Sequence, residues 1–166
     1  MLKLNNGENK MKTLKEIKKI QKDRSNFEIL RNVLECDDNN NIFCSIRNLD
    51  CREMFIDSLT DNGDGLSVRN ICLSTDEESN NFETWKGVKE FYGIERKDIS
   101  VLRKLGLIEN HGVFFDDGTL HITLNNSKVV DFIDSLVLDN EWFEIMDELQ
   151  IRKSELESEL ELLNQI

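Results

Sequence analysis

The sequence of 166 residues predicts a mixed α+β fold that is mostly helical. Apolar residues recur at intervals of three and four over residues 13–35 and over much of 127–166, a pattern typical of amphipathic helices. Between these stretches, residues 82–124 resemble two short helices around a glycine turn, followed by a two-stranded hairpin. We therefore expect an N-terminal lobe of helix and strand, a central helical unit with a hairpin, and a long C-terminal helix.

Composition and charge narrow the function classes. The chain has no proline, is rich in asparagine, lysine, isoleucine and glutamate, and carries a net charge of −12. The composition is typical of AT-rich genomes, such as those of phages, plasmids and low-GC bacteria. The charge is uneven, because residues 85–104 carry a net +3 whereas residues 25–84 and 131–166 each carry −9. The central unit is therefore a basic island in a chain that, as a whole, repels nucleic acid.

The cysteines and the hydropathy pattern indicate where the protein works. Four cysteines without CxxC spacing favour free, buried thiols in a reducing compartment over a disulfide scaffold. No apolar run is long enough to span a membrane, and the lysine-rich N-terminus lacks the apolar core of a secretory signal. We expect an intracellular, cytoplasmic protein with no membrane partner.

Four segments follow from the patterns along the chain. We expect a disordered tail, an α/β lobe, a helical unit with a hairpin and a C-terminal helix, at residues 1–10, 11–74, 82–126 and 127–166. In the lobe, Thr13 and Glu16 form a capping-box signature at the start of the first helix. The lobe should also hold a strand, a short helix and a second strand, at residues 42–46, 50–59 and 66–73, before a polar linker at 74–81.

The central unit is organised around one glycine. Trp85, Val88 and either Phe91 or Tyr92 share one helix face, and Gly93 then offers a position where positive φ costs little. A second helix over residues 95–105 turns three apolar side chains inward, and a glycine stops it; these residues are Ile99, Leu102, Leu105 and Gly106.

This pattern resembles the helix-turn-helix family. Val88, Gly93, Ile94, Ile99 and Leu102 fall where that family has its apolar and glycine positions. Lys89 departs from the pattern, because a small residue is usual there. The strands expected at residues 113–115 and 120–124, around an Asp-Gly turn, resemble the wing of winged-helix proteins.

The resemblance implies DNA binding through the second helix. The side chains expected to contact DNA are basic or hydroxylic: Lys86, Arg96, Lys97, Ser100, Arg103 and Lys104. Glu95 and Asp98 on the same helix, and Asp116 and Asp117 at the tip of the wing, oppose this role. A winged helix that docks on protein, or is purely structural, is the alternative.

The C-terminal helix carries half of a coiled-coil seam. Trp142, Leu149, Leu156 and Leu163 recur every seven residues, and Ile145 fills one partner position. These five residues predict a dimer interface, as in winged-helix regulators that dimerise through helices outside the DNA-reading unit. The alternative is a helix that packs on its own domain.

Sequence motifs for catalysis, cofactors or metals are missing. There is no phosphate-binding glycine loop, GxSxG, HExxH or paired CxxC, and His111 and His121 lack further ligands nearby. We expect a non-catalytic protein without cofactor or metal that binds DNA as a homodimer and regulates transcription. The alternative is an acidic inhibitor that docks on a basic nucleic-acid-handling protein; in size and charge the chain is similar to small phage anti-defence proteins, including anti-CRISPR proteins.

Overall fold

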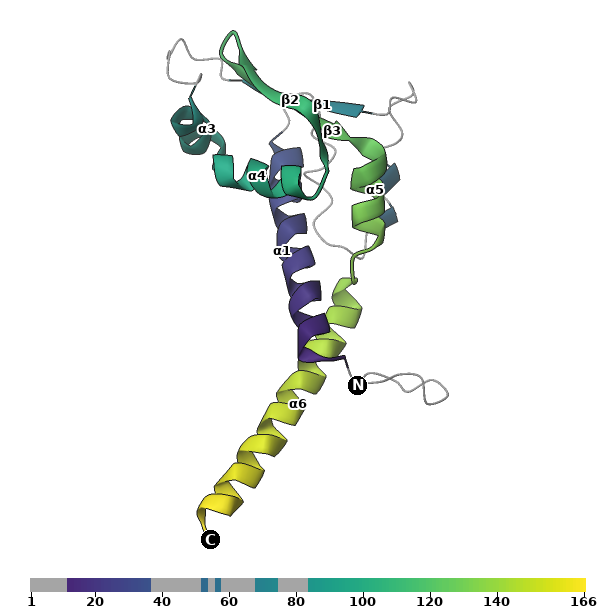
Figure 1. Ribbon diagram of the computed structural model, residues 1–166, viewed down its shortest axis with the longest axis vertical. Coiled ribbons are helices and arrows are strands. Elements are labelled where there is room, and N and C mark those ends of the chain that lie inside the picture. The colour runs from purple at the N-terminus through teal and green to yellow at the C-terminus, as the bar shows by residue number, and fades with distance from the viewer. Residues whose placement is uncertain (1–11, 37–51, 54–55, 58–67, 75–83) are drawn as a thin grey trace. The chain divides into compact units, whose positions relative to one another are not determined.

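The computed structural model describes residues 12–36, 52–53, 56–57, 68–74 and 84–166 (Figure 1). The described residues form a mixed α+β fold that is mostly helical, as predicted, with one three-stranded antiparallel sheet. The elements are α1 (Leu14–Glu35), β1 (Val68–Ser74), α3 (Trp85–Tyr92), α4 (Arg96–Lys104), β2 (Ile108–Asp116), β3 (Thr119–Asn125), α5 (Asn126–Asp134) and α6 (Asp139–Asn164).

Some of the predicted segments lie outside the described part of the chain. These are the disordered tail at 1–10, the strand at 42–46 and most of the linker at 74–81. Of the helix predicted at 50–59, residues 52–53 and 56–57 are helical. The strand predicted at 66–73 is observed as β1, and residues 66 and 67 are not described.

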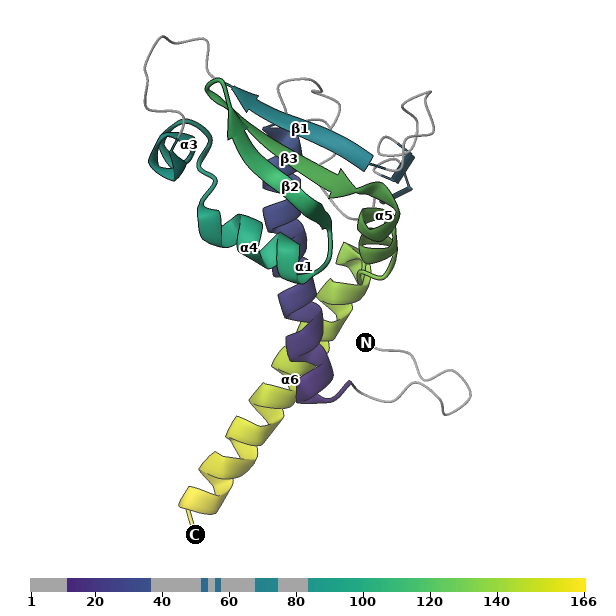
Figure 2. The ribbon, with the colours of Figure 1, turned by 45° about the horizontal axis from the view of Figure 1, so that its top comes forward.

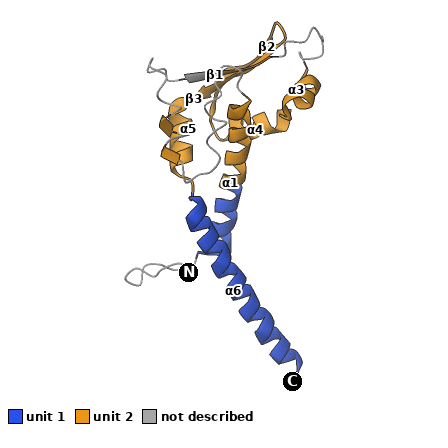
Figure 3. Cartoon of the chain, turned by 180° about the vertical axis from the view of Figure 1, so that it is seen from behind, with its two compact units in different colours: residues 1–22, 137–166 blue, residues 23–136 orange. Residues whose placement is uncertain are grey.

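The chain divides into two compact units, which Figure 3 colours separately. One unit contains residues 23–136, and the other contains residues 1–22 together with 137–166. The division differs from the expected segments, because β1 was assigned to the N-terminal lobe but pairs with β3 of the hairpin.

The sheet has the strand order β1-β3-β2, so β3 is the central strand (Figure 2). Ile71 lies opposite Ile122, and Leu73 opposite Leu120, in the register of β1 with β3. These side chains are fully buried, while the intervening residues of β3 are partly exposed, as expected for a sheet with one covered face. Helices α1, α4 and α5 supply the rest of this core, through Phe27, Leu30, Val33, Leu34, Ile99, Leu102, Val129 and Ile133.

The hairpin between β2 and β3 turns at Asp117 and Gly118. Both residues have positive φ, 47° and 75°, which matches a type I′ turn and the Asp-Gly signal in the sequence. Further down β2 the register shifts between Ile108 and Val113, which marks a bulge. In this bulge a Cβ on Gly112 would lie 2.8 Å from the Glu109 carbonyl oxygen, so the backbone can approach only because the residue is glycine.

Helix α1 begins with the predicted capping box. The Thr13 N–H donates to Glu16 Oε2 at 2.9 Å, and the Glu16 N–H donates to Thr13 Oγ1 at 3.2 Å. The predicted apolar stripe is largely buried along the helix. Leu14 is different, because 61% of its surface is exposed.

The break between α3 and α4 falls at Gly93, as predicted. Gly93 has φ 73° and ends α3, while the Thr84 side chain caps its start by accepting from the Gly87 N–H. Figure 2 shows α3 and α4 running in different directions on the two sides of this residue. Of the two aromatic candidates for the inner face, Tyr92 is the one used: its hydroxyl donates to the Ser74 carbonyl, whereas Phe91 is 56% exposed.

The C-terminal segment predicted at 127–166 divides into α5 and α6. The C-cap of α5 is Ser135, whose hydroxyl donates to the Phe132 carbonyl oxygen at 2.7 Å. Asp139 and Glu141 occupy the first turn of α6, where negative charge stabilises the helix dipole. Among the described residues, no helix is long and apolar enough to cross a membrane.

Gly93 and Gly112 should respond differently to substitution. Gly93→Ala should lower the free energy of unfolding by about 1–2 kcal/mol through backbone strain, and Gly93→Asn should cost less, because Asn tolerates positive φ. Gly112→Ala should cost about 1–3 kcal/mol through overpacking, and Gly112→Asn should bring no relief. Urea unfolding of the four variants measures this. Equal costs for Ala and Asn at position 93 would contradict the assigned role of Gly93.

Candidate nucleic-acid interface

Charged side chains stabilise both ends of helix α4. Its N-cap is Glu95, whose backbone N–H donates to Asp98 Oδ2 at 2.9 Å. Arg103 and Lys104 lie in the last turn, where cations complement the helix dipole. The buried side includes Ile99. The two acidic residues that seemed to oppose DNA binding therefore serve to start the helix.

The predicted DNA-contacting residues of α4 share one face. At about 100° per residue, the side chains fall within an arc of about 120°, in the order Arg103, Arg96, Ser100, Lys104 and Lys97. Four of the five are exposed and Ser100 is partly exposed. Asp98 lies outside this arc, on the side of Leu102. The helix therefore presents its cations together and keeps its internal acid apart from them.

A groove of about 170 Å³ lies between α4, α3 and β2. Arg96, Ser100 and Arg103 line it, three residues that share the cationic face of α4. The remaining lining is apolar and comes from Trp85, Ile99, Val113, Phe114 and Phe115. The groove thus combines guanidinium groups with aromatic walls, a pairing suited to a nucleic-acid strand.

The aromatic side chains that line the groove contact other aromatic rings. Trp85 and Phe115 meet edge to face, with ring centroids 5.6 Å apart. Phe114 is 48% exposed and stacks on His121, with centroids 4.8 Å apart and planes 14° from parallel. These aromatic residues were not among the predicted site residues. The sequence signal was there, since Val113-Phe114-Phe115 places aromatic side chains on both faces of β2.

Glu95 forms ion pairs with one lysine of the cationic face and with one lysine of α3. Its carboxylate oxygens lie 2.8 Å from Lys89 Nζ and 2.9 Å from Lys97 Nζ. These contacts, with Lys89 first, lower the pKa of the Glu95 carboxyl from its ordinary 4.5, and the contact with Glu95 raises the pKa of Lys97. The structure thus places Lys97 at the predicted surface but pairs it with an acid, which sequence reasoning did not foresee.

Four other charged positions lie apart from the groove. Lys104 is exposed on the arc of α4, and Lys86 is exposed on α3, and neither lines the groove. Asp116 and Asp117 are exposed at the hairpin turn. The tip of the hairpin is therefore acidic at the surface, and the cationic surface is confined to the helices.

The predicted dimer residues become more exposed toward the C-terminal end of α6. Ile145 is 1% exposed, and it lines a cavity with Leu14, Ile17 and Leu149, which removes it from any surface open to a second chain. Trp142 and Leu149 are partly exposed. Leu156 and Leu163 are 58% and 66% exposed. The single chain therefore uses the first turns of α6 for its own packing, and leaves the later leucines open.

Two of the four cysteines are described; neither forms a disulfide, and both are partly exposed rather than buried. Cys36 Sγ lies 3.8 Å from the Tyr92 carbonyl oxygen, and Cys72 Sγ lies 3.5 Å from His121 Nδ1. In the described part of the chain, no cluster of three or more His, Cys, Asp or Glu could hold a metal ion. Comparison with protein-family models, with curated proteins and with solved structures finds no match to this chain.

The pairing of Glu95 predicts an acid-dependent contribution to stability. Because the folded-state pKa of Glu95 is lowered, its contribution is present above the unfolded-state pKa and is lost as pH falls through the folded-state value. An NMR titration should place the Glu95 carboxyl pKa below 4.5 and bring it back toward 4.5 in a Lys89→Met, Lys97→Met variant. An unchanged titration in that variant would contradict the pairing.

Proposed function

We propose that residues 84–125, together with α1 and β1, form a winged helix-turn-helix unit that binds double-stranded DNA through α4, and that the protein acts as a dimer. The order of elements supports this: helix, strand, two helices separated by a left-handed glycine, then a hairpin. The observation that carries the proposal is the cationic arc of α4, which is exposed and continuous with a groove lined by Arg96 and Arg103.

The side chains of α4 suit different parts of a duplex. Arg96 lies in the first turn of the helix, the part of a recognition helix that meets base edges, and its guanidinium can bind guanine bidentately. Ser100, Arg103 and Lys104 follow along the same arc and can hold backbone phosphates. The aromatic rings beside the arginines offer apolar contact to sugars or to thymine methyl groups.

The acidic hairpin tip limits how the unit can sit on DNA. Asp116 and Asp117 are exposed, and phosphates repel them. We therefore assign the DNA contacts to α4 and to the side of β2 that lines the groove, and not to the tip. A single unit of this kind makes few phosphate contacts, so a dimer is needed for a steep salt dependence and for affinity at physiological salt.

Reversing the charge of the first turn of α4 tests this function. Arg96→Glu with Lys97→Glu should weaken binding to a pool of random duplex DNA by about tenfold or more, and should reduce the salt slope by about 1 for each phosphate that is no longer neutralised. Fluorescence anisotropy at several salt concentrations measures both quantities. Lys15→Glu with Lys18→Glu is the matched control, since it makes the same charge change at exposed residues of α1.

Two results would overturn the proposal. The first is the absence of any salt-sensitive binding by the unsubstituted protein. The second is an equal weakening of binding in the control, which would show that net charge, and not the α4 surface, governs the interaction. Circular dichroism of each variant establishes that the helices are retained.

Removing the acid that binds Lys97 should strengthen DNA binding. Glu95→Gln releases Lys89 and Lys97 and removes one negative charge beside the cationic arc. We expect binding about two- to fivefold tighter at low salt, the range that an exposed ion pair can contribute, with the gain fading as salt rises. Glu90→Gln on α3 is the control, because it removes the same charge outside this pairing. An equal gain in both variants would contradict a specific effect of Glu95.

A further inference from the structure

The C-terminal part of α6 is exposed along its whole length. Every residue from 151 to 166 is exposed, and these include large apolar side chains that are 58% to 66% exposed: Leu156, Ile151, Leu160, Leu162 and Leu163. Helices in water depend mainly on tertiary packing for their stability. An apolar helix face of this length therefore indicates an interaction surface.

Three of the exposed leucines, Leu156, Leu160 and Leu163, fit one heptad register. With Leu149, Leu156 and Leu163 at d positions, the a positions are Met146, Lys153 and Leu160. This differs from the register expected from the sequence, in which Ile145 fills one partner position. Continued along α6, that register would place Arg152 and Glu159 in the seam. Because Ile145 is buried within the chain, we assign the seam to the second register, which places Arg152 and Glu159 at g positions, beside the seam.

We propose that this face binds a second copy of the chain, with the two α6 helices antiparallel over residues 146–163. The proposal deepens the dimer of the proposed function by assigning its interface and orientation. In this arrangement Leu149 of one copy meets Leu160 of the other, and Lys153 meets Leu156. The contact is isologous, so each pair occurs twice and the assembly closes as a dimer.

Charge favours the antiparallel orientation over the parallel one. Antiparallel helices place Arg152 of each copy against Glu159 of the other, which gives two opposite-charge pairs at the g positions. Parallel helices would place the two Lys153 residues face to face in the seam. The antiparallel arrangement also sets the two helix dipoles in opposite directions.

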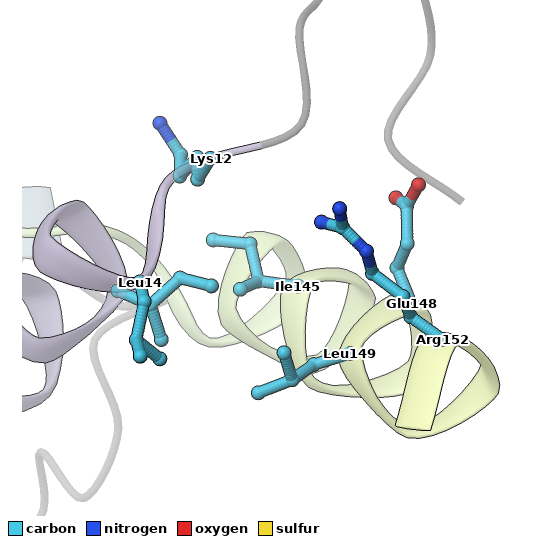
Figure 4. A pocket seen from close by; sticks show the side chains of 7 residues that line it. Lys12, Leu14, Ile145, Glu148, Leu149 and Arg152 are labelled. Atoms are coloured by element: carbon cyan, nitrogen blue, oxygen red, sulfur yellow. The ribbon is translucent and has the colours of Figure 1, made fainter. Parts of the chain in front are cut away.

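In the proposed dimer, the C-terminal end of α6 from the second copy covers a cavity that residues 145–152 of α6 help to line. Figure 4 shows Leu14 facing Ile145 and Leu149, with Lys12, Glu148 and Arg152 at the edges. In the proposed pairing Leu163 of the second copy lies at Met146, next to this cavity, and can cover the exposed side of Leu14. The segment that carries it contains Glu159 and Glu161, which complement the charge of Lys12 and Arg152.

The oligomeric state of the full-length protein tests the interface. Light scattering after size exclusion, without DNA, should give about twice the chain mass of 19.4 kDa. Leu160→Asp should reduce it to the monomer. Leu162→Asp is the matched control, because Leu162 is similarly exposed in the single chain but lies at a c position, away from the seam. It should leave the dimer intact.

Charge exchange tests the orientation. Arg152→Glu should weaken dimerisation about tenfold, because two attractive pairs are replaced by two repulsive ones. Adding Glu159→Arg should restore the dimer if the helices are antiparallel, whereas adding Glu157→Arg should not. Rescue by Glu157→Arg would indicate a parallel pairing and would overturn the proposed orientation.

Other results would overturn the interface itself. A monomer at every concentration of the unsubstituted protein would do so, as would equal dissociation by Leu160→Asp and Leu162→Asp. Because the mass is measured without DNA, these outcomes are separate from a failure of DNA binding. Circular dichroism reports whether each variant keeps its helices.

Discussion

Antiparallel pairing on both edges of β3 holds the described core of residues 23–136 together. Strand β3 is hydrogen-bonded to β2, its neighbour along the chain, and to β1, whose residues lie about fifty positions earlier. The alternation of Leu120, Ile122 and Leu124 along β3 creates the apolar face on which the helices pack. Without that face, Ile99 and Leu102 of α4 would have no core to enter, and the cationic arc opposite them would have no fixed direction.

The same unit carries cationic and acidic side chains close together on its surface. The cations of α4 lie on one arc, yet Glu95 pairs with Lys97 of this arc and with Lys89 of α3, and the hairpin tip is acidic. Such opposing charges lower non-specific affinity for DNA, because that affinity follows the number of phosphates neutralised. In the proposed complex with DNA, contacts that depend on geometry, such as those of Arg96 and Arg103 within the groove, would then contribute a larger share of the binding free energy.

Sequence reasoning located the elements better than their partners. The capping box at Thr13, the break at Gly93 and the Asp-Gly turn are local signals, and the structure has all three. The pairing of β1 with β3 could not be foreseen, because strand propensity does not indicate which strands meet. Similarly, heptad spacing identified the leucines of α6 but not the burial of Ile145, which depends on tertiary packing around Leu14 and Ile17. The ion pair of Lys97 with Glu95 depends on side-chain placement at the helix start.

The hydroxyl of Tyr92 and the carbonyl of Ser74 join the end of β1 to the end of α3. An edge strand of the sheet is thereby tied to the helix that precedes Gly93 and α4. The sheet therefore reaches the pair of helices through a hydroxyl that lies outside α4.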